Sequence, residues 1–326
     1  MGSQFFSIFK KEFALFDEYF KRLIESDFSV FKNISDYIFS MSGKKTRPLL
    51  LFYTHKIFSQ EVEKKAYLSA ALIEIIHSVS LLHDDVVDEA KQRRGKPSAS
   101  ALWGNEAVVL AGDYMLANSF LRAFDDKDDT LMQMLIQVVK DMSEGELLQI
   151  QYNILPTITE QQYFEIIDRK TAGLFSCCCR AGAYTAGASK EQIEIVSKMG
   201  RELGLAFQIK DDLTDVNPAK NDGKPYGQDI REKKINLPTL YFIEQATESE
   251  KEEISHIWES ADPPAYGMIE KILAAINSSN AVPRCREKIK HHYENAISML
   301  SDLNVTTLPP QIRNFFSFIS VDDEVR

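Results

Sequence analysis

Apolar residues recur at intervals of three and four positions along nearly the whole chain, and this pattern limits the possible folds most strongly. The spacing places apolar side chains on one face of an α-helix, whereas a half-buried β-strand requires alternation of apolar and polar residues. Runs of strict alternation enriched in β-branched residues are absent from the sequence. We therefore predict an all-α protein.

The helix boundaries follow from this periodicity and from capping-box patterns, which occur at Thr159 with Gln162, Ser189 with Gln192, and Thr247 with Glu250. The predicted helices cover residues 4–26, 28–41, 46–59, 63–89, 105–126, 130–154, 160–186, 190–216, 236–246, 249–260, 264–278 and 283–302. No repeat of fixed period and no low-complexity linker divides the chain. A hydrophobic content of 44% can fill a large core, so we expect one domain over residues 1–326.

Composition and charge exclude several classes of protein. The formal net charge of −10 argues against general affinity for nucleic acid or an anionic membrane, because both require a positive face. The N-terminal residues lack a secretory signal, and no uncharged apolar stretch reaches the ~18 residues of a membrane span. The four cysteines, Cys177, Cys178, Cys179 and Cys285, have neither disulfide-framework nor zinc-site spacing. We interpret them as reduced core residues of a cytoplasmic protein.

Two polar segments interrupt the helical pattern, "AKQRRGKPSAS" at 90–100 and "NPAKNDGKPYGQDIREKKIN" at 217–236. Each follows an acidic helix end. Long polar loops inside compact domains are usually functional or disordered, and we expect these two to be functional.

The acidic helix ends carry the same Asp-Asp-x-x-Asp spacing. Asp84, Asp85 and Asp88 form the first cluster, and Asp211, Asp212 and Asp215 form the second. One such cluster is typical of a solvated helix end, but two copies favour a shared role. Residues four apart lie on one helix face, and hard cations such as Mg²⁺ are held by one or two carboxylates together with substrate phosphates. The calcium-loop pattern does not fit either cluster.

Cations lie close to these acids in the sequence. Arg93 and Arg94 follow the first cluster, Lys224 and Lys234 follow the second, and "SGKKTRP" supplies Lys44, Lys45 and Arg47 at a predicted helix start. Guanidinium groups match phosphate oxygens in pairs, and helix N-termini favour anions. The sequence therefore predicts a phosphorylated ligand bound together with metal ions.

Five ordered motifs between about Gly43 and Pro238 closely resemble the trans-isoprenyl diphosphate synthases, the head-to-tail polyprenyl synthases. They are "GKKTRP", "HSVSLLHDDVVDEAKQRRG", "EGELLQ", "KTAGLF", and "FQIKDDLTDV" with "KPYGQDI" after it. The resemblance implies a helical bundle with a central active-site cavity that forms a homodimer. It also implies Mg²⁺-dependent condensation of isopentenyl diphosphate with an allylic diphosphate, such as dimethylallyl, geranyl or farnesyl diphosphate.

The same resemblance assigns roles to individual residues. Asp84, Asp88 and Asp211 would be the main Mg²⁺ ligands, with Asp85, Asp212 and Asp215 nearby or acting through water. Arg93 would bind the allylic diphosphate, while Lys44, Arg47, His77 and Arg94 would bind isopentenyl diphosphate. Lys170, Lys224 and Lys234 would bind the allylic leaving group, and Thr171 and Gln208 would line the carbocation. Ser42 and Lys233 depart from the family pattern, since glycine is common at both positions.

Some of these residues have simpler interpretations. His77 is also compatible with a hydrogen-bonded core histidine. Glu146 and Gln149 are interpreted as polar groups that support a helix rather than as catalysts, and the Cys177–Cys179 run as packing.

The implied chemistry requires no Ser or Cys nucleophile, and no convincing arrangement for one is found. Metal ions, Arg and Lys would stabilise the departing diphosphate, which could itself accept the proton lost after condensation. Water must be kept from the cation, and the two polar loops are candidate lids.

Product length is predicted from the helix that precedes Asp84. Val79 and Ser80 lie about one turn earlier, and in the family a bulky aromatic residue there stops elongation early. Ile76, Leu116 and Phe120 are candidates for a deeper limit. One turn rises by about the length of an isoprene unit, so the limit is expected deeper along the helix than Val79 and Ser80. Because neither of these two side chains is aromatic, we predict a long product of about C30–C45, such as a quinone side-chain precursor. Geranylgeranyl diphosphate, or farnesyl diphosphate, is the alternative product.

Two other functions share part of this pattern. A class I terpene cyclase has the first acidic cluster, but its second metal motif is normally of an Asn/Ser/Glu type. A non-catalytic subunit of a synthase is expected to lose one acidic cluster, whereas both are intact here.

Overall fold

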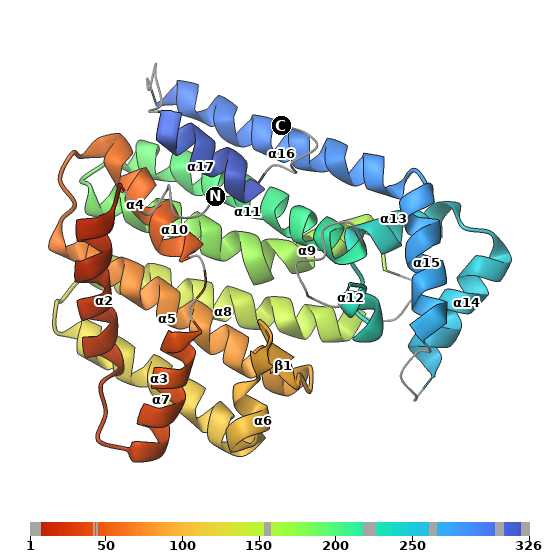
Figure 1. The fold of residues 1–326 in the computed structure, drawn as a ribbon. Coiled ribbons are helices and arrows are strands. Elements are labelled where there is room, and N and C mark those ends of the chain that lie inside the picture. The colour runs from red at the N-terminus through yellow and green to blue at the C-terminus, as the bar shows by residue number, and fades with distance from the viewer. Residues whose placement is uncertain are drawn as a thin grey trace. The chain divides into compact units, whose positions relative to one another are not determined.

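Helices make up nearly all of the described chain, which confirms the all-α prediction (Figure 1). The computed structural model describes residues 8–41, 43, 45–152, 158–217, 226–260, 266–303 and 310–320. The helices are α2 (Lys10–Ile24), α3 (Ser29–Ser40), α4 (Thr46–Phe58), α5 (Lys64–Val87), α6 (Ala99–Trp103), α7 (Asn105–Phe124), α8 (Asp129–Tyr152), α9 (Glu160–Ile167), η1 (Asp168–Ala172), α10 (Gly173–Thr185), α11 (Lys190–Val216), α12 (Gln228–Arg231), α13 (Leu237–Gln245), α14 (Glu248–Glu259), α15 (Tyr266–Ser278), α16 (Ala281–Asp302) and α17 (Pro310–Ser320).

The chain divides into two compact units, each built from several segments. Unit 1 comprises residues 1–139, 175–197 and 303–312, and unit 2 comprises residues 140–174, 198–302 and 313–326. The chain passes between the units inside helices α8, α10, α11 and α17.

Unit 1 is packed around α5, whose residues 66–76 are all buried. Aromatic side chains pack α2 against α4: the rings of Phe9 and Tyr53 lie 4.8 Å apart, and those of Phe13 and Phe52 lie 5.8 Å apart, both edge to face. Within the described residues, α5 alone is long and apolar enough to cross a membrane. Because 72% of its apolar window is buried in the protein, this helix has the properties of a core helix.

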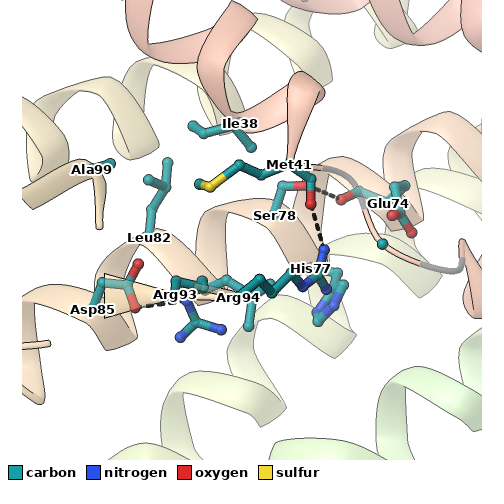
Figure 2. Close-up of a pocket in the computed structure, with 12 residues that line it drawn as sticks. Ile38, Met41, Glu74, His77, Ser78, Leu82, Asp85, Arg93, Arg94 and Ala99 are labelled. Carbon is teal, nitrogen blue, oxygen red and sulfur yellow. Dashed lines mark hydrogen bonds and ion pairs between the residues drawn. The ribbon is translucent and has the colours of Figure 1, made fainter. Parts of the chain in front are cut away.

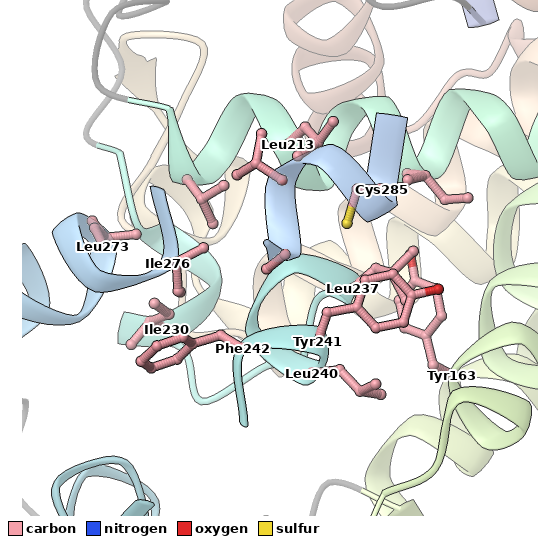
Figure 3. Packing of buried hydrophobic residues seen from close by; sticks show 14 of the residues in the cluster. Tyr163, Leu213, Ile230, Leu237, Leu240, Tyr241, Phe242, Leu273, Ile276 and Cys285 are labelled. Atoms are coloured by element: carbon pink, nitrogen blue, oxygen red, sulfur yellow. The ribbon is translucent and has the colours of Figure 1, made fainter. Parts of the chain in front are cut away.

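Unit 2 has its own hydrophobic core, formed by α9, the end of α11 and helices α12 to α16 (Figure 3). Tyr163, Leu237, Tyr241 and Ile276 are among its buried members, each at most 2% exposed. This core surrounds the C-terminal half of α11, which carries the second aspartate cluster.

The predicted helix boundaries that fall within the described residues agree with the structure within a few residues, whereas the predicted starts at 4 and 264 and the predicted end at 154 lie outside them. The capping hydrogen bonds at Thr159, Ser189 and Thr247 are present. The exceptions are local. Residues 90–100 contain the short hairpin β1 (Gln92–Arg93) and β2 (Lys96–Pro97) and the start of α6, and residues 217–236 contain the four-residue helix α12. The predicted helix 160–186 includes the π-helical segment η1, and α17 was not predicted.

Candidate active site

The first aspartate cluster lies at the C-terminus of α5. The helix ends where Glu89 adopts a left-handed conformation (φ 49°) and the Ala90 amide donates to the Asp85 carbonyl at 3.0 Å. This is the usual geometry of a helix C-terminus. Asp84 and Asp88 are half-buried, whereas Asp85 is only 3% exposed.

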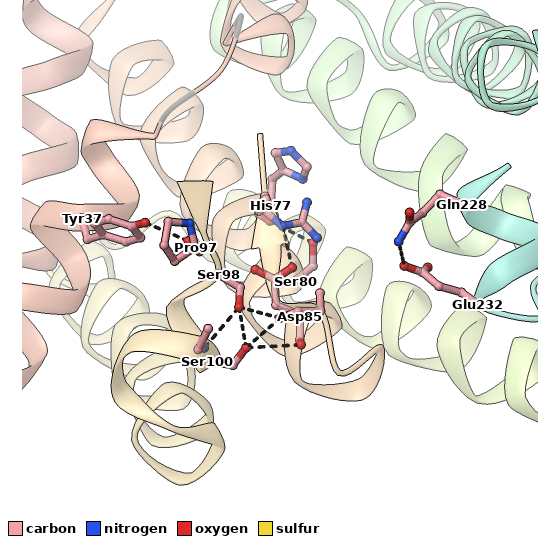
Figure 4. Close-up of polar contacts among 12 residues, drawn as sticks. Tyr37, His77, Ser80, Asp85, Pro97, Ser98, Ser100, Gln228 and Glu232 are labelled. Atoms are coloured by element: carbon pink, nitrogen blue, oxygen red, sulfur yellow. Dashed lines mark hydrogen bonds and ion pairs between the residues drawn. The ribbon is translucent and has the colours of Figure 1, made fainter. Parts of the chain in front are cut away.

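The buried Asp85 carboxylate holds the β-hairpin that follows α5. Arg93 donates from Nε to Asp85 Oδ1 at 2.7 Å. Ser98 and Ser100 reinforce this connection, since the Ser98 hydroxyl donates to the Ala90 carbonyl at 2.5 Å and the Ser100 hydroxyl lies 3.4 Å from the Asp85 carbonyl (Figure 4). The hairpin and its two arginines are therefore fixed to the acidic end of α5.

Arg94 occupies the tip of the hairpin in a strained backbone conformation. Arg94 and Gly95 have φ values of 53° and 74°, as a two-residue hairpin turn with positive φ at both positions requires. The guanidinium donates to the Met41 carbonyl at 2.5 Å. It lies against Gly43, where an added Cβ would come within 2.6 Å of its nitrogen atoms. Gly43 thus allows the basic turn and the hairpin to meet.

Gly43, Asp85, Arg93 and Arg94 line one pocket of unit 1 (Figure 2). The pocket encloses about 490 Å³ of empty space, part of which is open solvent at its mouth. Four of the residues predicted for the site line it: His77, Asp85, Arg93 and Arg94. Burial, together with Arg47, Arg94 and Arg93, holds the pKa of His77 well below the ordinary histidine value. The imidazole is therefore neutral at physiological pH, a form in which one ring nitrogen can donate a hydrogen bond and the other can accept one.

Glu74, which we did not predict, lines the same pocket. Its side chain is 7% exposed, and burial raises its pKa, although Arg47, Lys45 and Arg94 act in the opposite direction. One signal in the sequence could have identified it: Glu74 precedes His77 by one helical turn and therefore shares its face of α5.

The basic turn before α4 is described in part. Lys44 lies outside the described residues, while Arg47 lies in the first turn of α4 with its guanidinium 5.5 Å from the centre of the Phe175 ring.

The two residues predicted to control product length lie in α5. Val79 is 4% exposed, and Ser80 is half-buried and donates to the His77 carbonyl at 2.9 Å.

In unit 2, Lys170 and Thr171 lie in the π-helical segment η1. Segments of this kind occur frequently at functional sites. Gly145 of α8 permits the close approach of η1, because a Cβ there would lie 2.7 Å from the Lys170 amide nitrogen. The Lys170 ammonium contacts Glu146 at 2.5 Å and Gln149 at 3.1 Å. Glu146 and Gln149 therefore hold the Lys170 side chain, a role beyond the helix support that we predicted for them.

A chain of hydrogen bonds joins Thr171 to the second aspartate cluster. The Thr171 hydroxyl donates to Gln208 Oε1 at 2.7 Å, and Gln208 Nε2 donates to Asp212 Oδ1 at 3.0 Å. Asp212 also accepts from the Tyr163 hydroxyl at 2.6 Å and from the Leu237 amide at 3.0 Å. Asp212 is 4% exposed, whereas Asp211 beside it is exposed.

Asp215 and Asp229 hold the segment that follows α11. The Asp215 carboxylate accepts from the backbone amides of Gln228 and Asp229, at 2.9 and 3.2 Å. Asp229 lies in the quoted motif "KPYGQDI" but was not predicted as a site residue; it accepts from Asn236 at 3.0 Å. Burial, and then the neighbouring Asp229 carboxylate, raise the pKa of both Asp212 and Asp215 above the ordinary aspartate value.

The lysines of this segment follow α12. Lys233 is left-handed (φ 55°), which accounts for the frequent glycine at this position, and its ammonium donates to the Ser260 carbonyl. Lys234 follows, with its ammonium 3.0 Å from Glu232. Lys224 lies outside the described residues.

The donor set fits a hard divalent cation, because both clusters offer carboxylate oxygens. In the parts of the chain that the structure describes, no three His, Cys, Asp or Glu side chains group as a ready-made metal site.

The chain is similar to proteins of one known family. The sequence profile described as "Polyprenyl synthetase" matches residues 28–276. The chain belongs to the polyprenyl synthetase family. It is accordingly a prenyltransferase of isoprenoid biosynthesis.

Two relatives of the family illustrate the similarity in sequence. The chain is 33% identical over 281 residues to octaprenyl diphosphate synthase of Escherichia coli K12, covering 86% of each chain. It is also 33% identical over 239 residues to geranylgeranyl diphosphate synthase of Saccharolobus solfataricus, covering 71% of this chain and 72% of the relative.

Solved structures of the polyprenyl synthetase family have the same fold. The decaprenyl diphosphate synthase of Rhodobacter capsulatus matches with a TM-score of 0.89 at 29% identity, covering 100% of both chains. A polyprenyl synthase of Caulobacter crescentus CB15, in complex with calcium and isoprenyl diphosphate, matches with a TM-score of 0.90 at 26% identity, covering 99% of this chain and 98% of that chain.

Proposed function

We propose that the chain condenses isopentenyl diphosphate with an allylic diphosphate, head to tail, to give a trans-polyprenyl diphosphate. The observation that carries this proposal is the pocket of unit 1, where His77, Arg93 and Arg94 converge beside α5, the helix that ends in Asp84 and Asp88. Cationic and neutral hydrogen-bond donors of this kind suit a diphosphate.

In the proposed reaction the allylic C1–O bond breaks and diphosphate leaves. The isopentenyl double bond then forms the new carbon–carbon bond to C1, and the proton lost from the resulting cation passes to the departing diphosphate. Lys170, Lys224, Lys234 and Arg93 would bind the allylic diphosphate, and Lys44, Arg47, His77 and Arg94 the other substrate. Thr171 and Gln208 would present oxygen atoms to the carbocation, an arrangement supported by their direct hydrogen bond.

Mg²⁺ is the proposed cofactor, with several ions per site. Asp84, Asp88 and Asp211 would bind the ions directly, because they are the more exposed members of their clusters. Asp85, Asp212 and Asp215 would act nearby or through water, since their carboxylates already accept hydrogen bonds from the protein. When bound, the metal would offset the negative charge that develops on the departing diphosphate.

The reaction is tested by measuring diphosphate release with each substrate alone and with both. The proposal predicts release only when both substrates and Mg²⁺ are present, and a large loss in Asp84→Asn. Asp113→Asn is the matched control, because that α7 carboxylate is 66% exposed. Release from the allylic substrate alone would instead indicate a cyclase, and no release in any mixture would indicate a non-catalytic subunit.

For the product we propose a long chain of about C30–C45. The chain length is judged against α5, since one helical turn rises by about the length of one isoprene unit. The absence of an aromatic side chain at Val79 and Ser80, together with the octaprenyl and decaprenyl relatives, supports this length. The geranylgeranyl synthase relative favours the shorter alternative.

Three further features complete the proposal. Units 1 and 2 would form a single domain, which the unbroken family match through segments of both units supports. The protein would be a homodimer, for which α7 offers exposed Leu110, Leu121 and Phe124. It would work in the cytoplasm, since its four cysteines are free and buried.

A further inference from the structure

Lys45 combines a strained backbone with an enclosed side chain. It directly precedes α4 with φ 41° and ψ 43°, and its carbonyl accepts from the Leu49 amide at 3.1 Å. A left-handed conformation costs energy in a residue that has a Cβ, and it persists where the surroundings hold it. The Lys45 side chain is 14% exposed, so it does not extend into solvent as a surface lysine would.

The side chain is enclosed by one carboxylate and three aromatic rings. The ammonium lies 2.5 Å from Asp17 Oδ1. It also lies 5.8, 4.9 and 5.2 Å from the ring centres of Phe13, Phe16 and Phe39. These distances are within the range of cation–π attraction. Asp17, Phe13 and Phe16 come from α2 and Phe39 comes from α3, so Lys45 connects the basic turn to both helices.

The turn that Lys45 holds includes Gly43, which lines the pocket, and leads into Arg47, which is proposed to bind isopentenyl diphosphate. Gly43, two residues earlier, contacts the Arg94 guanidinium, and Arg47, two residues later, lies over Phe175. A shift of the turn would move both. The Lys45 ammonium, by contrast, already has a carboxylate partner and three rings around it.

We propose that Lys45 is a positioning residue, which clamps the basic turn to α2 and α3 through Asp17 and the three phenylalanines and does not itself bind diphosphate. The inference rests on the proposed function, because the groups it positions are those assigned to isopentenyl diphosphate.

Asp17→Asn gives the decisive test, because the two possible roles of Lys45 predict opposite signs. If Lys45 is a clamp, loss of the carboxylate loosens the turn and raises KM for isopentenyl diphosphate about 5- to 10-fold, since small misplacements of binding groups are costly. The kcat and the KM for the allylic substrate would stay within about twofold. If Lys45 bound diphosphate directly, removal of a competing carboxylate would leave the KM for isopentenyl diphosphate unchanged or lower it.

Glu12→Gln is the matched control. The Glu12 carboxylate lies 3.9 Å from the Lys56 ammonium and likewise joins α2 to α4, but away from the turn. This variant is expected to leave both KM values unchanged. Lys45→Arg should restore most of the wild-type affinity, because arginine keeps the charge and the cation–π contacts.

Lys45→Gly separates the clamp from the backbone strain. Glycine adopts the left-handed conformation without penalty, so the fold is expected to be retained while KM for isopentenyl diphosphate still rises. Thermal unfolding of each variant identifies any that are not folded at the assay temperature. If Asp17→Asn is one of them, Phe39→Leu replaces it as the test, because loss of this ring loosens the clamp and raises KM for isopentenyl diphosphate, whereas a Lys45 that binds diphosphate directly would be freed and KM would not rise. An unchanged KM in Lys45→Gly, or in folded Asp17→Asn, would overturn the inference. A wild-type protein that does not condense the substrates would overturn the proposed function instead.

Discussion

At the scale of single residues, three of the six clustered aspartates hold neighbouring parts of the chain through hydrogen bonds. Asp85, Asp212 and Asp215 accept hydrogen bonds that fix the hairpin, Gln208 and the segment after α11. Asp84, Asp88 and Asp211 are more exposed than Asp85 and Asp212. We infer that the first group orients the site and the second binds the ions, which is the usual division between metal ligands and the groups around them.

The repeated spacing predicted both clusters but could not predict this division. Asp84 and Asp85 are adjacent in the sequence, and consecutive helical residues point about 100° apart, so packing alone decides which one is buried. The left-handed conformations of Lys45 and Arg94 could not be predicted either, because neither lysine nor arginine marks such a position.

Ser80→Phe tests the proposed control of product length. Ser80 precedes Asp84 by one turn of α5, where a phenyl ring would obstruct a chain extending from the metal site. We expect the product to shorten to geranylgeranyl or farnesyl diphosphate, while the first condensation on dimethylallyl diphosphate keeps its rate within a few-fold. Products are identified by chromatography after dephosphorylation. An unchanged product distribution would contradict a chain path past Ser80.

At the scale of helices, the periodicity predicted element type and most boundaries, because long amphipathic segments pack as their apolar faces dictate. It missed η1, since a π-helical segment inserts one residue without changing the apolar pattern greatly. It also missed the β1–β2 hairpin, whose strands comprise only Gln92–Arg93 and Lys96–Pro97. The two elements that the periodicity missed carry predicted site residues: η1 carries Lys170 and Thr171, and the hairpin carries Arg93 and Arg94.

Gly145→Ala tests whether the approach of α8 to η1 matters for activity. The added Cβ would lie 2.7 Å from the Lys170 backbone nitrogen, and backbone cannot yield as a flexible side chain can. We expect kcat to fall about tenfold or more, because Lys170 and Thr171 would shift. Gly267→Ala is the control, since its added Cβ meets nothing within 4 Å. Equal kcat for the two variants would contradict this role of Gly145.

Asp128 joins three helices and provides a test of stability against pH. Its carboxylate accepts from the Leu131 amide at the start of α8, from Lys65 of α5 and from Tyr184 of α10, at 3.1, 2.8 and 2.8 Å. Burial alone would raise its pKa, but these hydrogen bonds outweigh burial and leave the pKa below the ordinary aspartate value. Asp128 therefore stabilises the fold above the pKa that it has in the unfolded chain.

We expect Asp128→Ala to lower the free energy of unfolding by about 2 kcal/mol at pH 7. The difference in free energy of unfolding between the variant and the wild type should shrink as pH falls through the lowered pKa of Asp128, because the wild-type carboxylate then becomes protonated. Urea titrations at several pH values measure this. Asp128→Asn, which keeps a capping side chain, should cost less, and a difference that does not shrink in acid would contradict the assignment.

At the scale of the whole molecule, each compact unit contains one acidic helix end and its own basic groups. Unit 1 contains Asp84, Asp88 and the pocket, whereas unit 2 contains Asp211, η1 and Lys234. This division could not be predicted from the sequence, because the chain passes between the units inside helices such as α8 and α11, where the helical pattern of the sequence is unbroken. The residues proposed for the condensation come from both units.

The proposed homodimer is tested through α7. Leu121 and Phe124 are 73% and 60% exposed there, and exposed apolar surface of this kind is typical of a protein–protein interface. Leu121→Lys combined with Phe124→Lys is expected to convert the dimer to a monomer in light scattering, while Ile8→Lys, at an exposed site outside α7, leaves it unchanged. A monomeric wild-type protein would contradict the homodimer.

The most direct test of the central claim is the product that the purified wild-type protein makes from labelled isopentenyl diphosphate and farnesyl diphosphate with Mg²⁺. Chain length is read after dephosphorylation. The account predicts trans-polyprenyl products of about C30–C45, and none when Mg²⁺ is chelated. Folded protein that fails to elongate any allylic diphosphate in the presence of metal would contradict it.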